Sequence, residues 1–201
     1  MTTAADNAGG KREAILEAAK KVFLEVGFGA ASMDAIANEA QVSKQTVYNH
    51  FGSKEELFAA MVRTSCDQTT LAFSEAAKSG DPEKTLRAIG QRFMSMVCAE
   101  DKLALHRILM AEVPRFPELG KSFYQSGPAV IRRFLADYFK EQNKRGTLKV
   151  DNPQVTAEQF ISMITSCRLR SDLGVEPAPN SEAREQYVNN AVSLIMRACK
   201  P

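Results

Sequence analysis

The feature that most limits the fold of this chain is the spacing of its apolar residues, which recur every three to four positions along almost its whole length. Between residues 11 and 26, for example, Ile15, Ala19, Val22 and Phe23 fall on one face of a helix. The chain has no run of alternating β-branched residues followed by a hairpin turn, so strands are not expected. The sequence therefore predicts an all-α protein.

Capping residues and helix breakers divide the chain into about nine helices. Ser32 and Ser43 are suited to cap two short helices at about 33–40 and 44–51, which follow a first helix at about 11–26. A long helix at about 54–78 comes next, and then helices at about 83–97, 100–113, 117–144 with a break at Gly127-Pro128, 153–171 and 181–199. We expect a disordered tail at 1–10, a three-helix unit at 11–58 and a larger helical bundle at 59–201.

Composition and motifs argue against a membrane protein, a secreted protein and an enzyme. No apolar run of the 201 residues reaches the roughly 18–20 needed to span a bilayer, and Met1 to Gly10 lacks the pattern of a signal peptide, so a cytoplasmic location is expected. The four cysteines form no C-x-x-C pair and the chain has two histidines, so neither a metal nor another cofactor is expected. The Gly-rich phosphate loop, the G-x-S-x-G elbow and the H-E-x-x-H motif are missing.

The segment from Ser32 to Lys54 has the pattern of a helix-turn-helix. Only residues 41–43 join its two short helices, which must therefore pack closely, and the small side chain of Ala37 permits this. No acidic residue occurs between Ala40 and Lys54, although residues 1–60 hold eight acidic and six basic residues. The outer face of the second helix suits a DNA major groove, about 12 Å wide, and an ordinary solvated face is the alternative. That face contains Lys44, Gln45, Tyr48 and Asn49, with Thr46 and His50 at its edges.

The same segment resembles the N-terminal domain of the TetR family of bacterial transcriptional regulators, over about residues 11–58. Gln41 stands where a glycine is often found. Members of this family are all-helical homodimers that bind palindromic operators, mostly as repressors, and release DNA when a small molecule binds. The resemblance is carried by Phe23, Gly27-Phe28, Ser32-Met33, Ile36-Ala37, Ala40-Gln41-Val42-Ser43, Thr46-Val47-Tyr48, His50-Phe51 and Ser53-Lys54-Glu55-Glu56-Leu57.

This resemblance implies a role for each residue that faces DNA. Lys44 and Gln45 would contact bases, and Tyr48 would be shared between base and backbone unless its ring packs under the turn. Lys54 would hold a phosphate at the start of a helix, where the helix dipole also favours an anion. The complete set of phosphate contacts would be Ser32, Thr46, Asn49, His50 and Lys54.

The C-terminal part resembles the AefR-like class within this family, through Leu105-His106-Arg107, Glu112 and residues 115–119 and 123–128. The resemblance implies that 59–201 binds a ligand and dimerises, but it names no ligand. Apolar sets at helical spacing predict a pocket for an apolar or aromatic molecule, with plain core packing as the alternative. Its lining would be Phe93, Met96, Val97, His106, Phe134, Tyr138, Met163 and Cys167. The last two helices would form the dimer contact through Phe160, Ile164, Tyr187, Ala191, Leu194, Ile195 and Ala198, unless this stripe faces its own subunit.

These expectations describe a sequence-specific DNA-binding regulator, most simply a repressor that an apolar or aromatic small molecule releases from a palindromic operator. Its partners would be double-stranded operator DNA, an effector of unknown identity and a second copy of the chain, and not a membrane. The alternative is a redox-sensing regulator that uses Cys66, Cys98, Cys167 or Cys199. No pattern places these cysteines beside a basic group at a helix start, so a low thiol pKa is not indicated. An enzyme is less favoured.

Overall fold

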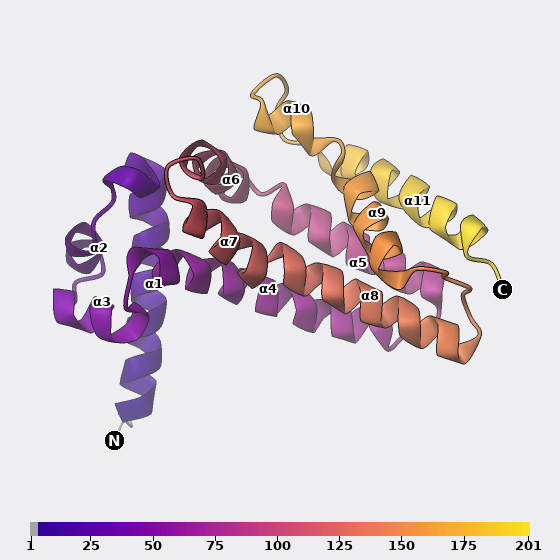
Figure 1. Cartoon of the computed structure of the whole chain (residues 1–201), viewed down its shortest axis with the longest axis horizontal. Coiled ribbons are helices and arrows are strands. Elements are labelled where there is room, and N and C mark those ends of the chain that lie inside the picture. The colour runs from indigo at the N-terminus through magenta and orange to yellow at the C-terminus, as the bar shows by residue number, and fades with distance from the viewer. Residues whose placement is uncertain (1–3) are drawn as a thin grey trace. The chain divides into compact units, whose positions relative to one another are not determined.

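The computed structural model describes residues 4–201, and Figure 1 shows that helices and their connecting turns make up this part of the chain. The prediction of an all-α protein is confirmed. The chain forms two compact units: unit 1 contains the residues up to Ser65 together with Ala104–Gly127, and unit 2 contains Cys66–Leu103 and Pro128–Pro201. This division differs from the predicted one at residue 58, because a later segment of the chain joins the first unit.

Unit 1 is built from α1 (Ala4–Ala30), α2 (Met33–Glu39), α3 (Lys44–Phe51), the first half of α4 (Lys54–Ala77), most of α6 (Glu100–Glu112) and α7 (Pro117–Ser126). The early start of α1 corrects the predicted disordered tail at 1–10, since residues 4–10 are helical and only 1–3 lie outside the described residues.

Gly27 interrupts the end of α1, as the sequence predicts. Its backbone has φ 79° and ψ 169°, a conformation that residues with a Cβ rarely adopt. The chain then makes one more turn, in which the amide of Ala31 donates to the carbonyl of Gly27 at 3.2 Å. The last three residues before α2 therefore form a tight corner between α1 and α2.

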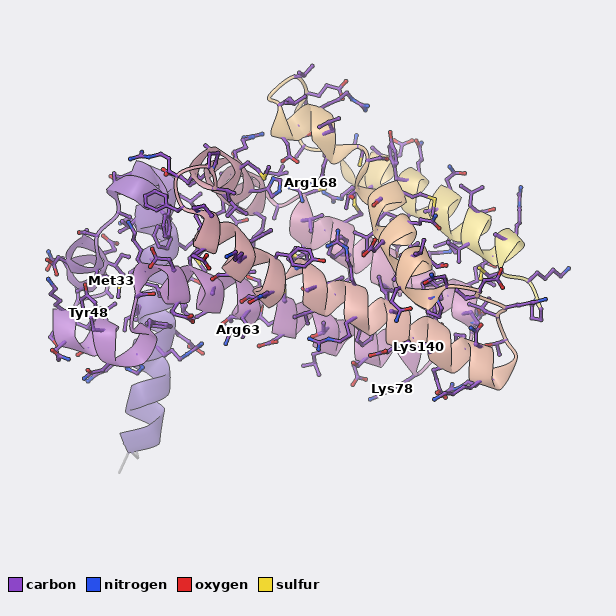
Figure 2. All side chains as sticks on the ribbon, viewed as in Figure 1. Met33, Tyr48, Arg63, Lys78, Lys140 and Arg168 are labelled. Atoms are coloured by element: carbon purple, nitrogen blue, oxygen red, sulfur yellow. The ribbon has the colours of Figure 1, made fainter. Side chains whose placement is uncertain are left out.

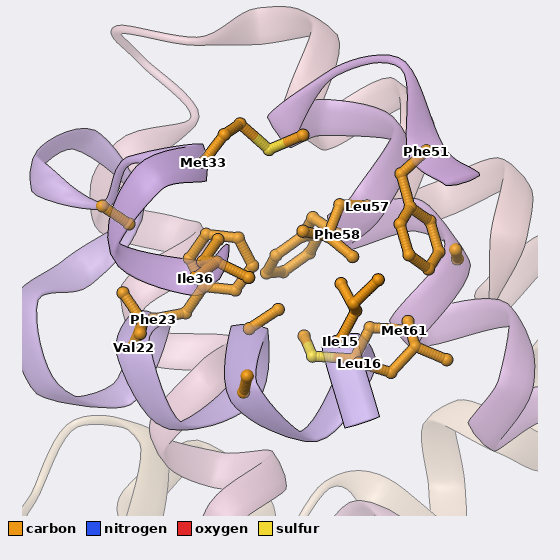
Figure 3. Packing of buried hydrophobic residues seen from close by; sticks show 14 of the residues in the cluster. Ile15, Leu16, Val22, Phe23, Met33, Ile36, Phe51, Leu57, Phe58 and Met61 are labelled. Carbon is orange, nitrogen blue, oxygen red and sulfur yellow. The ribbon is translucent and has the colours of Figure 1, made fainter. Parts of the chain in front are cut away.

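One hydrophobic core joins the helices of unit 1, and Figure 3 shows part of it. The rings of Phe23, Phe28 and Phe58 lie 5.5–5.9 Å apart, and Phe116, from the start of α7, lies 5.4 Å from Phe28. Burying each phenylalanine contributes about 1.5–3 kcal/mol. Three leucines of α6 and α7, Leu105, Leu109 and Leu119, are buried in the same cluster. The helix-turn-helix thus shares its core with α6 and α7.

Unit 2 contains α5 (Pro82–Val97), α8 (Pro128–Arg145), α9 (Pro153–Thr165), α10 (Arg168–Asp172) and α11 (Ser181–Ala198), with the second half of α4. Asp81 caps α5 by accepting from the amides of Glu83 at 2.9 Å and Lys84 at 3.2 Å. Helices α5, α9 and α11 pack together around Gly90. A Cβ placed there would lie 2.8 Å from the side chain of Val188, so the close approach of α11 depends on this glycine.

Two predicted helices are each divided in the structure. The break at Gly127-Pro128 separates α7 from α8, as predicted. The predicted helix at 153–171 is also two helices, although it contains no glycine and no internal proline. Near the break, Thr165 donates to the carbonyl of Ile161 at 2.8 Å and Ser166 to that of Met163 at 2.9 Å. Bonds of the same kind occur within α4, which is continuous, so they do not by themselves account for the division.

Candidate DNA-binding interface

Serine caps fix the ends of the helix-turn-helix. The Oγ of Ser32 accepts from the amide of Ala35 at 3.1 Å and so begins α2, and Ser43 begins α3 through the amide of Thr46 at 3.1 Å. Ser53 likewise accepts from the amide of Glu56 at 3.1 Å, at the start of α4. The capping predictions for Ser32 and Ser43 are confirmed. The caps satisfy backbone amides that each helix start would otherwise leave unpaired.

The turn between α2 and α3 depends on an unusual backbone conformation at Gln41. Its φ of 53° lies in the left-handed region, which costs about 1–2 kcal/mol for a residue with a Cβ. This left-handed conformation turns the chain so that the amide of Val42 donates to the carbonyl of Ala37 at 3.0 Å. Ile36, Ala37 and Val47 are buried between the helices, so the opposite face of α3 points to solvent.

That outer face of α3 carries the side chains predicted to contact DNA. Lys44, Gln45, Tyr48 and Asn49 are exposed, and Figure 2 marks Tyr48 on this helix. The Tyr48 ring is 41% exposed, and the ammonium of Lys44 lies 5.9 Å from its centre. The ring is therefore not packed under the turn. This face is an accessible strip of hydrogen-bonding groups, without an acidic residue of its own.

Two hydrogen-bonded pairs organise the side chains around this face. Lys44 pairs with Asp34 of α2 at 2.9 Å, and the partners are each 59% exposed. Gln45 donates to Asn49, one turn further along α3, with 2.7 Å between Nε2 and Oδ1. Both pairs leave donors that an incoming duplex could use. They also hold the side chains in defined positions before any duplex arrives.

The remaining predicted phosphate contacts on α2 and α3 are partly covered or engaged. Ser32 is exposed, and its hydroxyl remains able to donate while it caps α2. Thr46 is half-buried, and its Oγ1 lies 2.8 Å from that of Ser43. His50 is half-buried beside the ring of Phe51, with centroids 6.0 Å apart.

Lys54 has other partners than the phosphate predicted from the sequence. Its ammonium nitrogen lies 2.6 Å from the carbonyl oxygen of Phe28 and 2.8 Å from that of Ala31. A third carbonyl, that of Gly29, is at 3.3 Å. An ammonium has three N–H donors, and the corner between α1 and α2 accepts all of them. Burial lowers the pKa of Lys54 below its ordinary value, although the negative charges of Glu55 and Glu112 act in the opposite direction. Lys54 therefore holds the corner together.

Glu112, the last residue of α6, closes the same corner. Its Oε1 accepts from the amide of Gly29 at 3.2 Å, and a Cβ on Gly29 would lie only 3.1–3.2 Å from the carboxylate oxygens. Sequence patterns assign Glu112 no role beyond the family resemblance. No local pattern could find this contact, since 83 positions separate Glu112 from Gly29. A polar joint thus ties α6 to the corner that precedes α2.

The residues of the predicted ligand pocket divide between the two units. His106 belongs to unit 1, where its ring lies 6.3 Å from Phe123, whereas the other seven belong to unit 2. Phe134 and Tyr138 line a groove of about 240 Å³ in unit 2. Phe93 and Cys167 are buried, and Met96, Val97 and Met163 are half-buried. The complete lining of the groove is Ala77, Phe134, Asp137, Tyr138, Glu141, Gln142 and Arg145.

The predicted dimer stripe divides into a buried and an exposed half. Leu194 is 48% exposed, Ala198 is exposed and Tyr187 is half-buried. The other members face their own chain, because α11 packs on α5 and α9 and its inner side closes their core. These buried members fit the alternative that the stripe faces its own subunit, and the dimer contact itself stays a prediction; they are Phe160, Ile164, Ala191 and Ile195.

The cysteines do not support the redox alternative. All four are free and buried. Burial raises the pKa of the thiols of Cys66 and Cys98 to about 11, and it also raises the pKa of Cys167 and Cys199 above its ordinary value. Only the thiolate form reacts readily with oxidants. A protein that senses oxidants would need at least one exposed thiol of low pKa.

An all-helical unit with a capped helix-turn-helix and an exposed polar recognition helix defines a DNA-binding protein of the helix-turn-helix class. Comparison with known families identifies it further. Residues 15–61 match the model of the bacterial regulatory proteins of the tetR family, and residues 84–201 match the C-terminal domain of AefR-like transcriptional repressors. The chain belongs to the TetR family, whose members are transcriptional regulators and not enzymes.

Curated relatives and solved structures agree with this assignment. The transcriptional regulator UidR of Escherichia coli K12 is 28% identical over 157 residues, 76% of each chain. The transcriptional activator FasR of Mycolicibacterium smegmatis is 36% identical over 88 residues, which cover 43% of this chain and 40% of FasR. A structure titled flavonoid-responsive regulator FrrA is 34% identical, with a TM-score of 0.74 over 96% of this chain and 98% of FrrA. A Mesorhizobium loti structure with a TM-score of 0.82 and 24% identity, over 96% and 98% of the chains, shares the fold.

No helix in the described part of the chain is both long and apolar enough to cross a membrane.

Proposed function

We propose that this regulator is a repressor that binds a palindromic operator as a homodimer and leaves it when a small aromatic molecule binds unit 2. The observation that carries the proposal is the exposed face of α3, which presents Lys44, Gln45, Tyr48 and Asn49 and no acid. Thr46 and His50 at its edges and Ser32 at the cap of α2 are the proposed phosphate contacts, together with Asn49. Lys54 is left out of this set because the corner of α1 accepts its three donors.

The aromatic effector is proposed from similarity to FrrA. Its title names it as flavonoid-responsive, and it is 34% identical over almost the whole chain. In this chain Phe134 and Tyr138 line the groove of about 240 Å³, beside Asp137 and Glu141. Pockets for drug-sized molecules usually measure about 300–1,000 Å³. An effector of flavonoid size therefore requires unit 2 to open, and that change of shape is what would alter DNA binding.

Dimerisation is proposed through the exposed side of α11 around Leu194 and Ala198. Leu194→Glu should shift the protein from dimer to monomer in sedimentation velocity, because a charge would be buried in an apolar contact. Leu71→Glu is the matched control, since Leu71 is also an exposed leucine, 67% accessible, but lies on α4. Equal effects of the two substitutions would contradict the proposed interface.

The experiment that tests the function is selection of bound duplexes from a random pool with the purified protein. The proposal requires a two-fold symmetric motif, with half-site centres about 34–36 Å apart or a multiple of that spacing. Flavonoids are then titrated against the complex, with cyclic aliphatic alcohols of similar size as the control. Release by flavonoids alone supports the effector class, and an asymmetric motif or none refutes the dimeric repressor. A reporter placed behind the selected site distinguishes repression from activation.

A further inference from the structure

The hydrogen bond between Gln45 and Asn49 determines which groups of Gln45 remain for a ligand. Both residues are exposed on the outer face of α3, one turn apart. The Nε2 of Gln45 donates one of its two N–H groups to Oδ1 of Asn49 across 2.7 Å. A glutamine amide has two donors and one acceptor oxygen. One N–H and the carbonyl oxygen of Gln45 therefore remain for a ligand.

A donor beside an acceptor matches one base edge of the major groove better than the others. Adenine presents N7 as an acceptor and the N6 amino group as a donor, so it pairs with both free groups of a glutamine amide. Guanine presents two acceptors, N7 and O6, and its O6 would face the carbonyl oxygen of Gln45. Cytosine offers only a donor there, and thymine offers an acceptor and a methyl group.

We propose that Gln45 reads an adenine in each half-site of the operator and that Asn49 is the residue that positions it. This inference rests on the proposed operator-binding function. Gln45 has a long side chain with several rotatable bonds, and fixing it on binding costs conformational entropy. The bond to Asn49 restricts those rotations before DNA arrives. Asn49, proposed above as a phosphate contact, keeps its own amide N–H groups for that purpose while its oxygen holds Gln45.

The neighbouring residue on the same face provides the contrast. Lys44 has only donors and is held by Asp34 at 2.9 Å, so it suits acceptor-rich guanine or a phosphate and not adenine. Lys44 and Gln45 are consecutive and both exposed, so they sample neighbouring positions on DNA. Lys44→Ala is therefore a control that removes a DNA-facing side chain without touching the amide pair.

The test replaces adenines of the selected operator, one at a time, by 7-deazaadenine, which has a C–H group in place of the N7 acceptor. With the wild-type protein, one adenine per half-site should show a loss of affinity of about 2- to 12-fold, the range for losing one of the two hydrogen bonds. Gln45→Ala should abolish this sensitivity, and Lys44→Ala should keep it. Gln45→Glu should change the preferred base at that position from adenine to cytosine, whose amino group donates to a carboxylate.

Variants of Asn49 separate its positioning role from a phosphate contact. Asn49→Asp keeps the oxygen that accepts from Gln45 and should keep the sensitivity to 7-deazaadenine, although its charge lowers affinity for every duplex. Asn49→Ala should reduce that sensitivity several-fold. Both residues are exposed, so melting temperatures should be unchanged, which excludes misfolding as the cause.

The two proposals fail differently in this experiment. A symmetric motif in which no adenine responds to the replacement overturns the inference about Gln45 and leaves the repressor intact. The same holds if Gln45→Ala keeps the full response, or if Asn49→Ala keeps it while Asn49→Asp loses it. Failure to select any motif overturns operator binding itself.

Discussion

Replacing Lys54 by methionine should destabilise unit 1 and leave the number of phosphate contacts unchanged. Methionine keeps an apolar stem but loses the ammonium, which donates to three carbonyls and lies 4.5 Å from the centre of the Phe28 ring. A hydrogen bond from a charged donor contributes about 1.5–3 kcal/mol, and the cation–π contact about 0.5–1 kcal/mol. Desolvation of the charge, which also lowers its pKa, offsets much of that sum. We expect a net loss of about 2–3 kcal/mol in the free energy of unfolding.

Thermal unfolding followed by circular dichroism measures this loss. In a chain of this size about 1 kcal/mol lowers Tm by roughly 2–4 °C, so Lys54→Met should lower it by about 4–12 °C. Lys21→Met is the matched control, because it removes the same charge from unit 1. The Lys21 side chain is 63% exposed and pairs with Glu39 at 2.6 Å on the surface, so its loss should change Tm by about 2 °C or less.

The salt dependence of DNA affinity tests whether Lys54 instead contacts a phosphate. At a temperature at which both proteins are folded, wild type and Lys54→Met should have the same slope of log affinity against log salt. Loss of one phosphate contact from each subunit of the proposed dimer would reduce that slope by about 1.8. An unchanged Tm together with a flatter slope would refute the structural role of Lys54 and restore the phosphate contact predicted from the sequence.

Three further substitutions test other parts of the structure. Asp34→Asn should raise DNA affinity several-fold in a binding titration, because it frees Lys44 and removes an anion beside the DNA-facing helix. Glu39→Gln is the control, since it removes the same charge from the last turn of α2. An equal gain in affinity from this control would show a general charge effect instead. Gln41→Gly should raise the free energy of unfolding in urea by about 0.5–1 kcal/mol, because glycine adopts φ 53° without strain. A lower free energy of unfolding would contradict the strain at the turn. Gly90→Ala should lower the free energy of unfolding by about 1–3 kcal/mol, because the new methyl group would lie 2.8 Å from a valine of α11. An unchanged midpoint of urea unfolding would mean that α11 is free to shift.

The helix-turn-helix could be predicted from the sequence because its signals are local. A serine cap begins α3 and Gly52, with φ 72°, ends it, so the predicted bounds 44–51 are those observed. The break before Pro128 and the cap at Asp81 are equally local. In each case the residues that fix the backbone lie within four positions of the group that they satisfy.

Contacts between distant segments could not be predicted in this way. The side chain of Lys54 reaches back about two dozen positions to the corner of α1, and Glu112 reaches back 83 positions. Lys54 is a residue type that often contacts phosphate, and only its buried surroundings reveal that it binds the carbonyls of the corner instead. Ile195 and Leu194 are adjacent apolar residues on α11, yet one is 6% and the other 48% exposed. Which of them covers the core depends on the packing of α5 and α9 and not on their spacing.

The shared core of unit 1 limits how this protein can be engineered. A chimaera joined at residue 58 would bring α1 to α3 without Leu105, Leu109 and Leu119, which close the same cluster. The graft would then expose the apolar surface that α6 and α7 normally cover, and it would lose the carboxylate that holds Gly29. A transplant of this recognition specificity into another regulator therefore has to carry residues 104–127 with it, or be restricted to the outward side chains of α3.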